Sequence, residues 1–477
     1  MLTPIIERFS SPLSPWEVYQ NLEGLSAGST FFLDSVEYRP PNQRYSYLGM
    51  DPFLEVKVIH DRIKISGAEE TNHPVDKLFE VLRGLFQQYR VDPGCKNIFF
   101  TGGAVGFWSY ELAAHFDKIR FRSKPKPDIP LLSLGFYRDL IVYDHRDRVY
   151  WLATHFSKGK RTEMKIARRN LNRLKSFFSR EPVLQGLVNP GLANLPLRNF
   201  RAEISRSEFE TMVRKAKTSI SAGEIYQANL SQRFSFDYDG SPLALYGCLR
   251  KINPSPFSAY LKMGDLTVIS SSPERLIRKR GSLCETRPIA GTRPVKLGSK
   301  SLHEVEEDLL ANEKERAEHI MLVDLERNDL GRVCDFKSVH VEEMMTIERY
   351  SHVIHIVSKI VGKLRQGKDG LDLIRAVFPG GTITGCPKIR CMEIIDELEP
   401  VGRGLYTGSL GWIDFKGDLD LNIVIRTILL RKEKGHFQVG AGIVHDSHPL
   451  REYEETLHKG EALAEALAQA SVGAGVV

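Results

Sequence analysis

An arginine inside an apolar strand is the feature that most limits how this chain can fold. Arg426 lies within the segment LNIVIRTILL (421–430), and a second strand-like segment, FQVGAGIV (437–444), follows after a short turn. A guanidinium removed from water is very costly unless an anion pairs with it. The fold must therefore bring an anionic group, from the chain or from a ligand, to this position.

Groups around this arginine suit a small polyanion held together with a divalent cation. The stretch Gly440-Ala441-Gly442 exposes backbone amides, and a predicted helix after it carries Glu455 and Lys459 four residues apart. Glu318 precedes an apolar run on a separate predicted helix. Carboxylates from two distant elements, with few histidines or thiols near them, suit an oxygen-seeking ion such as Mg²⁺. On local grounds alone, the same glutamates also fit solvated helix faces, where Glu–Lys pairs are favourable.

Composition favours a globular chain that handles small anions over one that binds nucleic acid or a membrane. The 477 residues are 42% hydrophobic, so they can bury a large core. The net charge of +6 comes from dispersed Lys and Arg residues rather than from a basic patch. Six cysteines show no CxxC pair, which indicates reduced thiols. We see no signal-peptide pattern and no run of ~18 apolar residues, so we expect a cytoplasmic protein.

The first part of the chain has the pattern of an antiparallel sheet. Short apolar runs separated by turn residues are typical of such strands, and here they are TFFLDSV, RYSYLGM, FLEVKVIH, AVGFWSY and LIVYDHRDRVYWLATH. A helix is predicted over 75–90, and a basic helix over 160–180. Residues 181–203, rich in Pro, Gly and Asn, are predicted to form a linker.

The second part alternates predicted strands and helices up to about residue 470. Ser205 or Ser207 is expected to cap its first helix, which ends at Gly223. One continuous helix is predicted over 304–329. Three antiparallel strands, with turns at KGD and KEKG, are predicted over 408–415, 419–430 and 436–444.

A segment between two prolines is expected to approach a ligand. Pro288 and Pro294 forbid a continuous helix, so residues 289–293 are predicted to form a loop. Gly291 would let the backbone present its N–H group at close range, and Thr292 adds a hydroxyl.

Two further segments place polar groups in apolar surroundings. The Gly-rich turn FPGGTITG (378–385) enters a predicted helix, an arrangement that presents free amides to an anion, and Lys388 and Arg390 add charge. The turn lacks the P-loop spacing, so nucleotide binding is not indicated. His355 fits either a satisfied core histidine or a group that orients or transfers a proton near neutral pH.

Seven segments of the second part of the chain occur in combination: ETRPIAGTRP, AEHIMLVDLERNDLGRV, ERYSHVIHIVS, FPGGTITGCPKIRCMEIIDELEP, LNIVIRT, GAGIV and EYEETLHK. Taken together, they resemble the chorismate-binding enzymes, a family that includes the first components of anthranilate and aminodeoxychorismate synthases and the isochorismate and salicylate synthases. The resemblance implies a chorismate-binding catalytic domain over 203–470. The segment FFLDSVEYRPPNQRYSYLGMDPF is similar to the N-terminal domain of anthranilate synthase component I, which implies such a domain over 1–190.

The same resemblance implies one α+β fold for the whole chain. Antiparallel sheets are expected to pack together with helices outside, and the N-terminal part is expected to be interwoven with the catalytic part. The active site is expected to lie in a cleft.

Roles for individual positions also follow from the resemblance. Glu318 and Glu455 match Mg²⁺ ligands that bridge to the ring carboxylate of chorismate. Glu274 matches an acid that protonates the departing C4 hydroxyl, which needs a proton because hydroxide is a poor leaving group. His355 matches a histidine beside the ring and is grouped with Glu274 and Thr292 as catalytic. The positions that match the groups holding the two carboxylates are Gly291, Thr292 and Lys459 for the ring carboxylate, and Tyr406, Arg426, Gly440, Ala441 and Gly442 for the enolpyruvyl carboxylate.

The branch of the family is indicated by a few positions that differ between its members. Gln227 stands where isochorismate-forming relatives have a lysine base, which favours an ammonia-using enzyme. Ala290 replaces the lysine of the PIKGT motif that is typical of aminodeoxychorismate synthases, as it does in anthranilate synthases. Asn229, the FLDS segment and the absence of Pro-Tyr-Met in NPSPFSAYL point instead to aminodeoxychorismate synthases. We expect 4-amino-4-deoxychorismate, a precursor of p-aminobenzoate and folate, with anthranilate as the alternative product.

The expected source of ammonia follows from the absence of a glutaminase motif in this sequence. It shows no Cys-His-Glu glutaminase arrangement, so ammonia is expected from a separate glutamine amidotransferase subunit, with chorismate as the small-molecule substrate. A non-catalytic chorismate sensor is an alternative from another class of protein. A sensor could lose its acid or a metal ligand, so the joint presence of the acid, both metal ligands and both basic residues argues against it.

Overall fold

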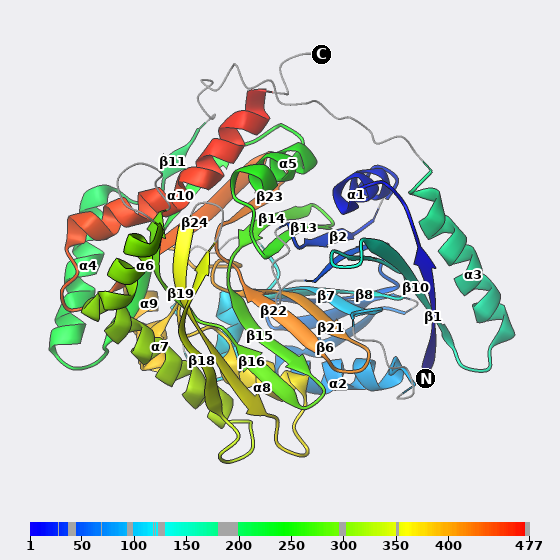
Figure 1. Ribbon diagram of the computed structural model, residues 1–477, viewed down its shortest axis with the longest axis horizontal. Coiled ribbons are helices and arrows are strands. Elements are labelled where there is room, and N and C mark those ends of the chain that lie inside the picture. Colours follow the sequence, from blue (N-terminus) through cyan, green and yellow to red (C-terminus); the bar gives the residue numbers. More distant parts are fainter. Residues whose placement is uncertain are drawn as a thin grey trace.

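Two large antiparallel sheets that face each other make up the protein (Figure 1). The computed structural model describes residues 1–26, 28–36, 44–67, 69–92, 99–117, 119, 121–122, 129–179, 199–294, 302–349 and 353–472, without the side chains of residues 292–294, 302, 314, 353 and 472. Most of the linker predicted over 181–203 therefore lies outside the described residues. The α+β class that the resemblance implied is confirmed.

Sheet 1 contains twelve strands in the described ranges. Its order is β1 (Leu2–Phe9), β10 (Val149–Ser157), β9 (Leu140–Asp144), β3 (Tyr45–Met50), β2 (Thr30–Asp34), β13 (Phe257–Met263), β14 (Leu266–Ser272), β23 (Thr427–Arg431), β24 (Lys434–Ile443), β12 (Gln227–Asp237) and β11 (Arg201–Ala202), with β20 (Gly385–Cys386) also on β12.

Sheet 2 also contains twelve described strands. Its order is β17 (Ile289–Pro294), β19 (Val353–Lys363), β16 (Leu283–Thr286), β15 (Arg275–Arg280), β22 (Leu419–Ile423), β21 (Ser409–Asp414), β7 (Gly103–Trp108), β8 (Leu132–Tyr137), β4 (Leu54–Ile59), β5 (Arg62–Ser66) and β6 (Thr71–Pro74), with β18 (His340–Arg349) also on β19.

Each sheet joins strands from both parts of the chain. In sheet 1 the N-terminal strand β2 pairs with β13, and in sheet 2 the N-terminal strand β7 pairs with β21. The facing sides share one apolar core, in which the rings of Phe31 and Tyr137 from opposite sheets lie 4.7 Å apart. The N-terminal part is thus interwoven with the rest, as expected, because neither half alone could complete its sheets.

Helices cover the outer faces of both sheets (Figure 1). On sheet 1 these are α1 (Pro15–Glu23), α3 (Arg161–Ser176), α5 (Pro242–Ile252) and α10 (Pro449–Val472), and α4 (Arg206–Ser221) packs against β12 and α10. On sheet 2 they are α2 (Leu78–Gln88), which follows the short helix η1 (Val75–Lys77), α7 (Glu313–Gly331) and α8 (Gly370–Val377), while α6 (Leu302–Ala311) packs against β17 and β19 and η2 (Tyr110–His115) follows β7. The helix α9 (Lys388–Leu398) packs against β12, β20 and α4. Among the helices in the described ranges, none is long and apolar enough to span a bilayer.

Two stretches of chain pass from one sheet into the other, side by side. One runs through β14 and β15, with Glu274 between them, and the other runs through β22 and β23, with Arg426 between them. The two crossings are tied together, because the Ile423 amide donates to the Glu274 carbonyl (3.0 Å) and the Ser271 amide donates to the Arg426 carbonyl (3.1 Å). The Glu274 carboxyl and the Arg426 cation therefore lie at one crossing point between the two sheets.

The prediction of a single strand over 419–430 is wrong. Its apolar residues continue without a break, but they belong to β22 in sheet 2 and β23 in sheet 1. Arg426 lies between these strands with φ of 50°, a left-handed conformation that ends regular pairing. An unbroken apolar pattern cannot reveal that the chain changes sheets.

Two other boundaries also differ from prediction. The segment 289–293 is strand β17, not a loop, since prolines exclude a helix but are tolerated on a strand at the edge of a sheet. The helix predicted over 304–329 is two helices, because Asn312 caps α7 by accepting from the Glu315 amide at 3.0 Å. The helices predicted over 75–90 and 160–180 and the Ser205 cap are confirmed.

A buried ion pair joins α9, the turn after it and β12. The Arg403 guanidinium lies 2.7 Å from Glu399 Oε1 and donates to the Asn229 carbonyl at 2.6 Å, and both charged side chains are almost fully buried. The same Glu399 oxygen accepts from the Ser231 amide at 2.9 Å. Each of the two buried charges is thus neutralised by the other.

Replacing Arg403 by Met should destabilise the protein strongly, because Glu399 would remain as a buried charge without its main partner. We expect a loss of about 3–5 kcal/mol in the free energy of unfolding, measured with chemical denaturant. Arg206→Met removes an ion pair with Glu210 on the exposed surface of α4 and should change stability little. Equal effects of the two substitutions would contradict this account of the buried pair.

Candidate active site

The crossing between the sheets places a buried acid at the centre of the site. Glu274 is 5% exposed, and its Oε1 atom has no hydrogen-bond partner among the described residues. Burial raises the pKa of Glu274 from 4.5 to about 7, although the Thr382 hydroxyl, the Ile289 backbone amide, Arg426 and Lys459 act in the opposite direction. The carboxyl can therefore hold a proton at neutral pH and also release it, as a general acid must.

Arg426 provides the opposite charge on the neighbouring crossing. The residue keeps part of its surface exposed, yet burial of its charged end lowers the pKa of the guanidinium, and Glu274 raises it. In the part of the chain that the structure describes, no hydrogen bond or ion pair satisfies this guanidinium. A largely desolvated cation in this state favours an anion that enters from outside.

His355 lies on β19, opposite Thr292 of β17. Its side chain is 3% exposed, and burial together with the nearby Arg426 lowers the pKa of the imidazole to about 4, while a hydrogen bond to the Gly291 backbone raises it. The ring is therefore neutral at pH 7 and can act through hydrogen bonds rather than as a cation. The Thr292 side chain, predicted to bind and to act in catalysis, lies outside the described residues.

Position 291 requires glycine because of its backbone conformation and because of the side chain that faces it. It has φ of 62° at a bulge in β17, and a Cβ atom there would come within 2.9 Å of Glu315 Oε2 on α7. Glu318 follows Glu315 by one helical turn and is partly buried. The predicted metal ligand on α7 thus lies one turn beyond the point where this helix meets β17.

Lys459 and the glycine stretch of β24 also meet. The Lys459 ammonium lies 2.7 Å from Glu455 Oε1 and donates to the Gly440 carbonyl at 3.1 Å. A Cβ atom on Gly440 would come within 2.7 Å of the Tyr406 hydroxyl and 2.6 Å of Asn229 Oδ1. Only glycine fits between these groups.

The glycine stretch lies where β24 separates from β23. Described pairing with β23 ends at the pair Ile428–Phe437, whereas pairing with β12 continues to Ile443. Residues 440–442 therefore have a neighbouring strand on the β12 side alone within the described sheet. This geometry leaves the other edge of β24 open for backbone contacts with a ligand.

Three polar side chains that the sequence did not single out as site residues also lie here. Gln227 Oε1, Asn229 Oδ1 and Thr382 Oγ are buried without hydrogen-bond partners among the described residues. Asn229 is opposite Gly442 in the register of β12 and β24, and Thr382 lies near Glu274. The polar residues Gln227 and Asn229 in a buried strand were the available signal, since buried polar atoms normally have partners.

Lys388 and Arg390 do not serve an anion at the Gly-rich turn, contrary to expectation. Lys388 forms an ion pair with Asp329, and Arg390 forms pairs with Glu224 and Glu393. Both side chains therefore form ion pairs within the protein, and these pairs connect α9 to its neighbours.

The predicted metal ligands fit a hard cation by their chemistry. Glu318 and Glu455 offer carboxylate oxygens from two helices, and no group of three or more His, Cys, Asp and Glu residues is gathered as a metal site in the described ranges. Mg²⁺ commonly binds one or two carboxylates and completes its shell with water and substrate oxygens. The donor set suits Mg²⁺ bound together with an anionic substrate.

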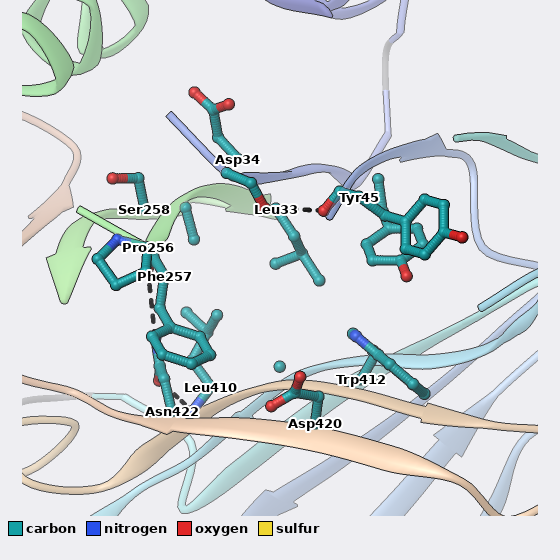
Figure 2. Close-up of a pocket in the computed structure, with 14 residues that line it drawn as sticks. Leu33, Asp34, Tyr45, Pro256, Phe257, Ser258, Leu410, Trp412, Asp420 and Asn422 are labelled. Atoms are coloured by element: carbon teal, nitrogen blue, oxygen red, sulfur yellow. Dashed lines mark hydrogen bonds between the residues drawn. The ribbon is translucent and has the colours of Figure 1, made fainter. Parts of the chain in front are cut away.

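A cavity that Glu274 does not line lies between the two sheets (Figure 2). It encloses about 370 Å³, part of it open to solvent, and residues of β2, β3, β13, β21 and β22 line it. Asp34 on its wall is 2.9 Å from Arg250, which neutralises that carboxylate. Ser35 of the FLDS segment and Pro256–Ser258 of the NPSPFSAYL segment also line this cavity.

Comparison with known proteins agrees with this geometry. The family model for chorismate binding enzymes matches residues 35–465. The chain is 42% identical over 424 residues to aminodeoxychorismate synthase component 1 of Bacillus subtilis (strain 168), covering 89% of each chain. It is 40% identical over 457 residues to anthranilate synthase component 1 of Methanothermobacter marburgensis, covering 96% of this chain and 93% of that one.

Solved structures show the same fold. Anthranilate synthase component I from Streptococcus pneumoniae TIGR4 matches with a TM-score of 0.78 at 31% identity, covering 96% of this chain and 99% of that one. The menaquinone-specific isochorismate synthase from Escherichia coli matches with a TM-score of 0.70 at 17% identity, covering 98% and 95%.

Replacing Arg426 by Met should stabilise the ligand-free protein. The substitution removes a charge that is buried without a partner, so we expect the free energy of unfolding to rise by on the order of 1 kcal/mol. Denaturant unfolding of the ligand-free protein measures this directly. Arg431→Met, which removes an exposed pair with Asp265 at the far end of β23, is the matched control. Destabilisation by Arg426→Met would mean that the guanidinium is already satisfied.

Proposed function

The chain belongs to the chorismate-binding enzyme family, and from this premise we propose that it aminates chorismate to 4-amino-4-deoxychorismate. The observation that carries the proposal is the juxtaposition of Glu274, an acid with a pKa raised to about 7, with Arg426, a cation without a partner in the described chain. Chorismate carries two carboxylates and a hydroxyl that must leave. Its amination therefore needs an acid to protonate the hydroxyl and a cation to bind a carboxylate.

Each side chain has a defined task in this proposal. Arg426 and the open edge of β24 at Gly440–Gly442 hold one carboxylate, and Lys459 attracts the other. Glu274 donates its proton to the C4 hydroxyl, so the C–O bond breaks and water leaves. Neutral His355 orients the ring through hydrogen bonds. Mg²⁺, when bound by Glu318 and Glu455, supplies charge stabilisation for the ring carboxylate.

Ammonia forms the new C–N bond directly at C4 in this proposal, and the proton that the nitrogen then loses returns to the Glu274 carboxylate. Position 290 is Ala290 in β17, so no side-chain amine is present there to attack the ring first. Relatives of this chain are named as component 1 of their synthases, which supports a second component that delivers ammonia, and we propose a glutamine amidotransferase subunit. A separate lyase would then release pyruvate from the product to give p-aminobenzoate.

Two observations favour each of the two amination products. The similarity to an aminodeoxychorismate synthase and the unsatisfied amide oxygen of Asn229 beside Gly440 support 4-amino-4-deoxychorismate. Ala290 and the 40% identity to an anthranilate synthase favour the second candidate, in which ammonia adds at C2 and pyruvate leaves to give anthranilate.

Product analysis separates the two candidates. We expect the purified protein with chorismate, Mg²⁺ and ammonium to yield no aromatic product until an aminodeoxychorismate lyase is added, when p-aminobenzoate appears. Chromatography with mass detection identifies the products, and Glu274→Gln serves as the inactive control because the amide cannot protonate the leaving hydroxyl. Anthranilate formed without the lyase would select the second candidate.

Loss of either proposed metal ligand should impair Mg²⁺-dependent turnover. Glu318→Gln and Glu455→Gln each remove a carboxylate charge, so we expect at least a tenfold loss of turnover, on the scale of a lost metal-site interaction. The measurement is the rate as a function of Mg²⁺ concentration.

Matched controls exist on the same two helices. Glu313→Gln at the exposed start of α7 and Glu461→Gln on the exposed side of α10 should leave the Mg²⁺ dependence unchanged. Wild-type behaviour of Glu318→Gln or Glu455→Gln would remove that residue from the metal site.

A further inference from the structure

An almost fully buried arginine lies behind the wall of the candidate site and has no part in the chemistry proposed above. Arg403 is 2% exposed and belongs to the stretch of chain between α9 and β21. Its charge is neutralised by Glu399, at a distance of 2.7 Å. A lysine would provide the same charge for such a pair, so the presence of a guanidinium here requires a further reason.

All five N–H groups of this guanidinium have acceptors. Two bonds go to the Glu399 carboxylate, from Nε to Oε2 at 3.0 Å and from Nη2 to Oε1 at 2.7 Å. The other three leave the ion pair: Nη2 donates to the Asn229 carbonyl at 2.6 Å, and Nη1 donates to the Ile383 carbonyl at 2.9 Å and to the Thr407 hydroxyl at 3.2 Å. One planar group therefore fixes β12, the Gly-rich turn and the chain after Tyr406 relative to one another.

Each of these three segments also carries a polar side chain at the candidate site. Asn229 Oδ1 and Thr382 Oγ are buried without hydrogen-bond partners among the described residues. The Tyr406 hydroxyl and Asn229 Oδ1 lie over the same glycine, since a Cβ atom on Gly440 would come within 2.7 Å of the first and 2.6 Å of the second. The residues that the guanidinium holds are therefore the polar residues of the site or their direct neighbours in the chain.

Tyr406 is held through its ring and through its backbone. The Arg403 Cζ atom lies 5.5 Å from the centre of the Tyr406 ring, and the Tyr406 amide donates to the Arg403 carbonyl at 3.2 Å. The next residue, Thr407, has φ of 60°, a left-handed conformation that a β-branched residue rarely adopts. Its hydroxyl accepts from Arg403 and donates to the Tyr406 carbonyl at 2.6 Å. The place of the Tyr406 ring thus depends on the guanidinium that holds this strained residue.

We propose that Arg403 is a positioning residue that sets Asn229 and Tyr406 around the carboxylate expected at Gly440. A lysine ammonium has three N–H groups and no flat face, so it could keep the charge opposite Glu399 but could not hold all three segments. This role deepens the proposed function and rests on its placement of chorismate at this site.

Arg403→Lys tests the role, because it keeps the charge opposite Glu399 that Arg403→Met removes. The positioned groups bind a carboxylate that does not react, so the KM for chorismate should rise about tenfold or more, while kcat changes by less than about threefold. The rates are measured well below the Tm of the variant. A merely structural role would reduce the fraction of folded protein, which lowers the apparent kcat and leaves KM unchanged. That outcome would overturn the proposal.

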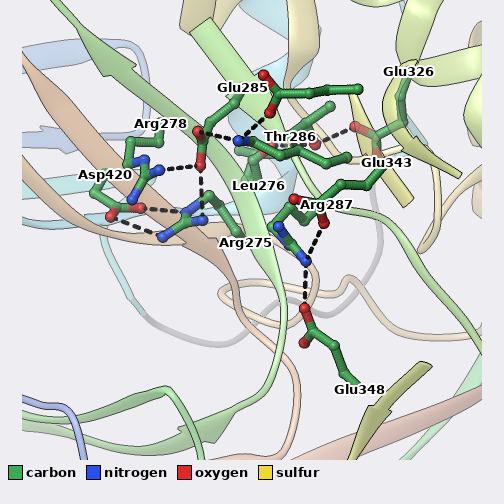
Figure 3. A network of polar contacts seen from close by, with 12 residues as sticks. Arg275, Leu276, Arg278, Glu285, Thr286, Arg287, Glu326, Glu343, Glu348 and Asp420 are labelled. Carbon is green, nitrogen blue, oxygen red and sulfur yellow. Dashed lines mark hydrogen bonds and ion pairs between the residues drawn. The ribbon is translucent and has the colours of Figure 1, made fainter. Parts of the chain in front are cut away.

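Arg278→Lys is the matched control. Arg278 is largely buried and forms an ion pair with Glu285 at 2.6 Å, and Figure 3 shows its guanidinium directed at that carboxylate within a network on sheet 2. This substitution also keeps the charge of a buried pair, and it should leave the KM for chorismate unchanged. An equal rise in KM for both variants would show a general response to the loss of a buried guanidinium and would contradict a specific role for Arg403.

A background without the positioned groups tests whether Arg403 acts through them. In a protein that carries both Asn229→Ala and Tyr406→Phe, the amide and the hydroxyl are absent, so adding Arg403→Lys should raise KM by less than about threefold. The same fold-change in this background and in the wild type would mean that Arg403 acts through other groups, and the proposal would be wrong.

Equilibrium binding separates this inference from the proposed function. Calorimetry with chorismate and Mg²⁺ in the absence of ammonium needs no turnover, and the Kd of Arg403→Lys should rise in parallel with its KM. If the wild type binds chorismate but forms no amination product, the proposed function fails, and the comparison of Kd values still decides the role of Arg403. Equal Kd values for the wild type and Arg403→Lys would overturn the inference even where amination is observed, and absence of binding by the wild type would overturn both.

Discussion

Removal of two opposite charges from water at a single crossing point is the constraint on which the rest of the structure depends. Glu274 and Arg426 lie where two neighbouring stretches of chain leave one sheet and enter the other, and backbone hydrogen bonds tie these crossings together. Glu274 Oε1 has no hydrogen-bond partner among the described residues, and no hydrogen bond or ion pair to the Arg426 guanidinium is found among them. Such a site is unfavourable without a ligand and becomes favourable when an anion with a protonatable group enters.

Well-satisfied ion pairs on both sides hold this unfavourable arrangement in place. Arg275, next to Glu274 in the chain, is 2.9 Å from Asp420 and 3.1 Å from Glu285 and so joins β15 to its neighbours β22 and β16. On the other side, Arg403 and Glu399 join α9 to β12. Rigid surroundings keep the acid and the cation fixed in place, so little reorganisation is needed when charge develops.

Many elements of the fold and several residues of the candidate site could be predicted from the sequence. The other features depend on tertiary contacts. Local patterns predicted the Ser205 cap and most N-terminal strands, since alternation of apolar residues and capping chemistry act over a few residues. The family resemblance led to Glu274, His355, Arg426 and Lys459. The structure brings Arg426 and Lys459 within electrostatic reach of Glu274, and Arg426 within reach of His355. Their roles in catalysis remain predictions.

Other features had no local signal. The apolar pattern of 419–430 gives no sign that the chain changes sheets at Arg426, and the prolines around β17 exclude a helix without excluding an edge strand. Glu326 has the appearance of a solvated helix residue, and only the packing of α7 against β17 and β19 makes it a buried acid. Long-range packing thus decides which charges are desolvated, and desolvation decides their chemistry.

A crystal structure of the protein with chorismate and Mg²⁺, in the absence of ammonia, tests the central claim most directly. The account predicts a carboxylate of chorismate on the Arg426 guanidinium and the C4 hydroxyl within hydrogen-bond distance of Glu274. Chorismate bound elsewhere, with Arg426 satisfied by a protein group and Glu274 far from the ligand, would contradict it.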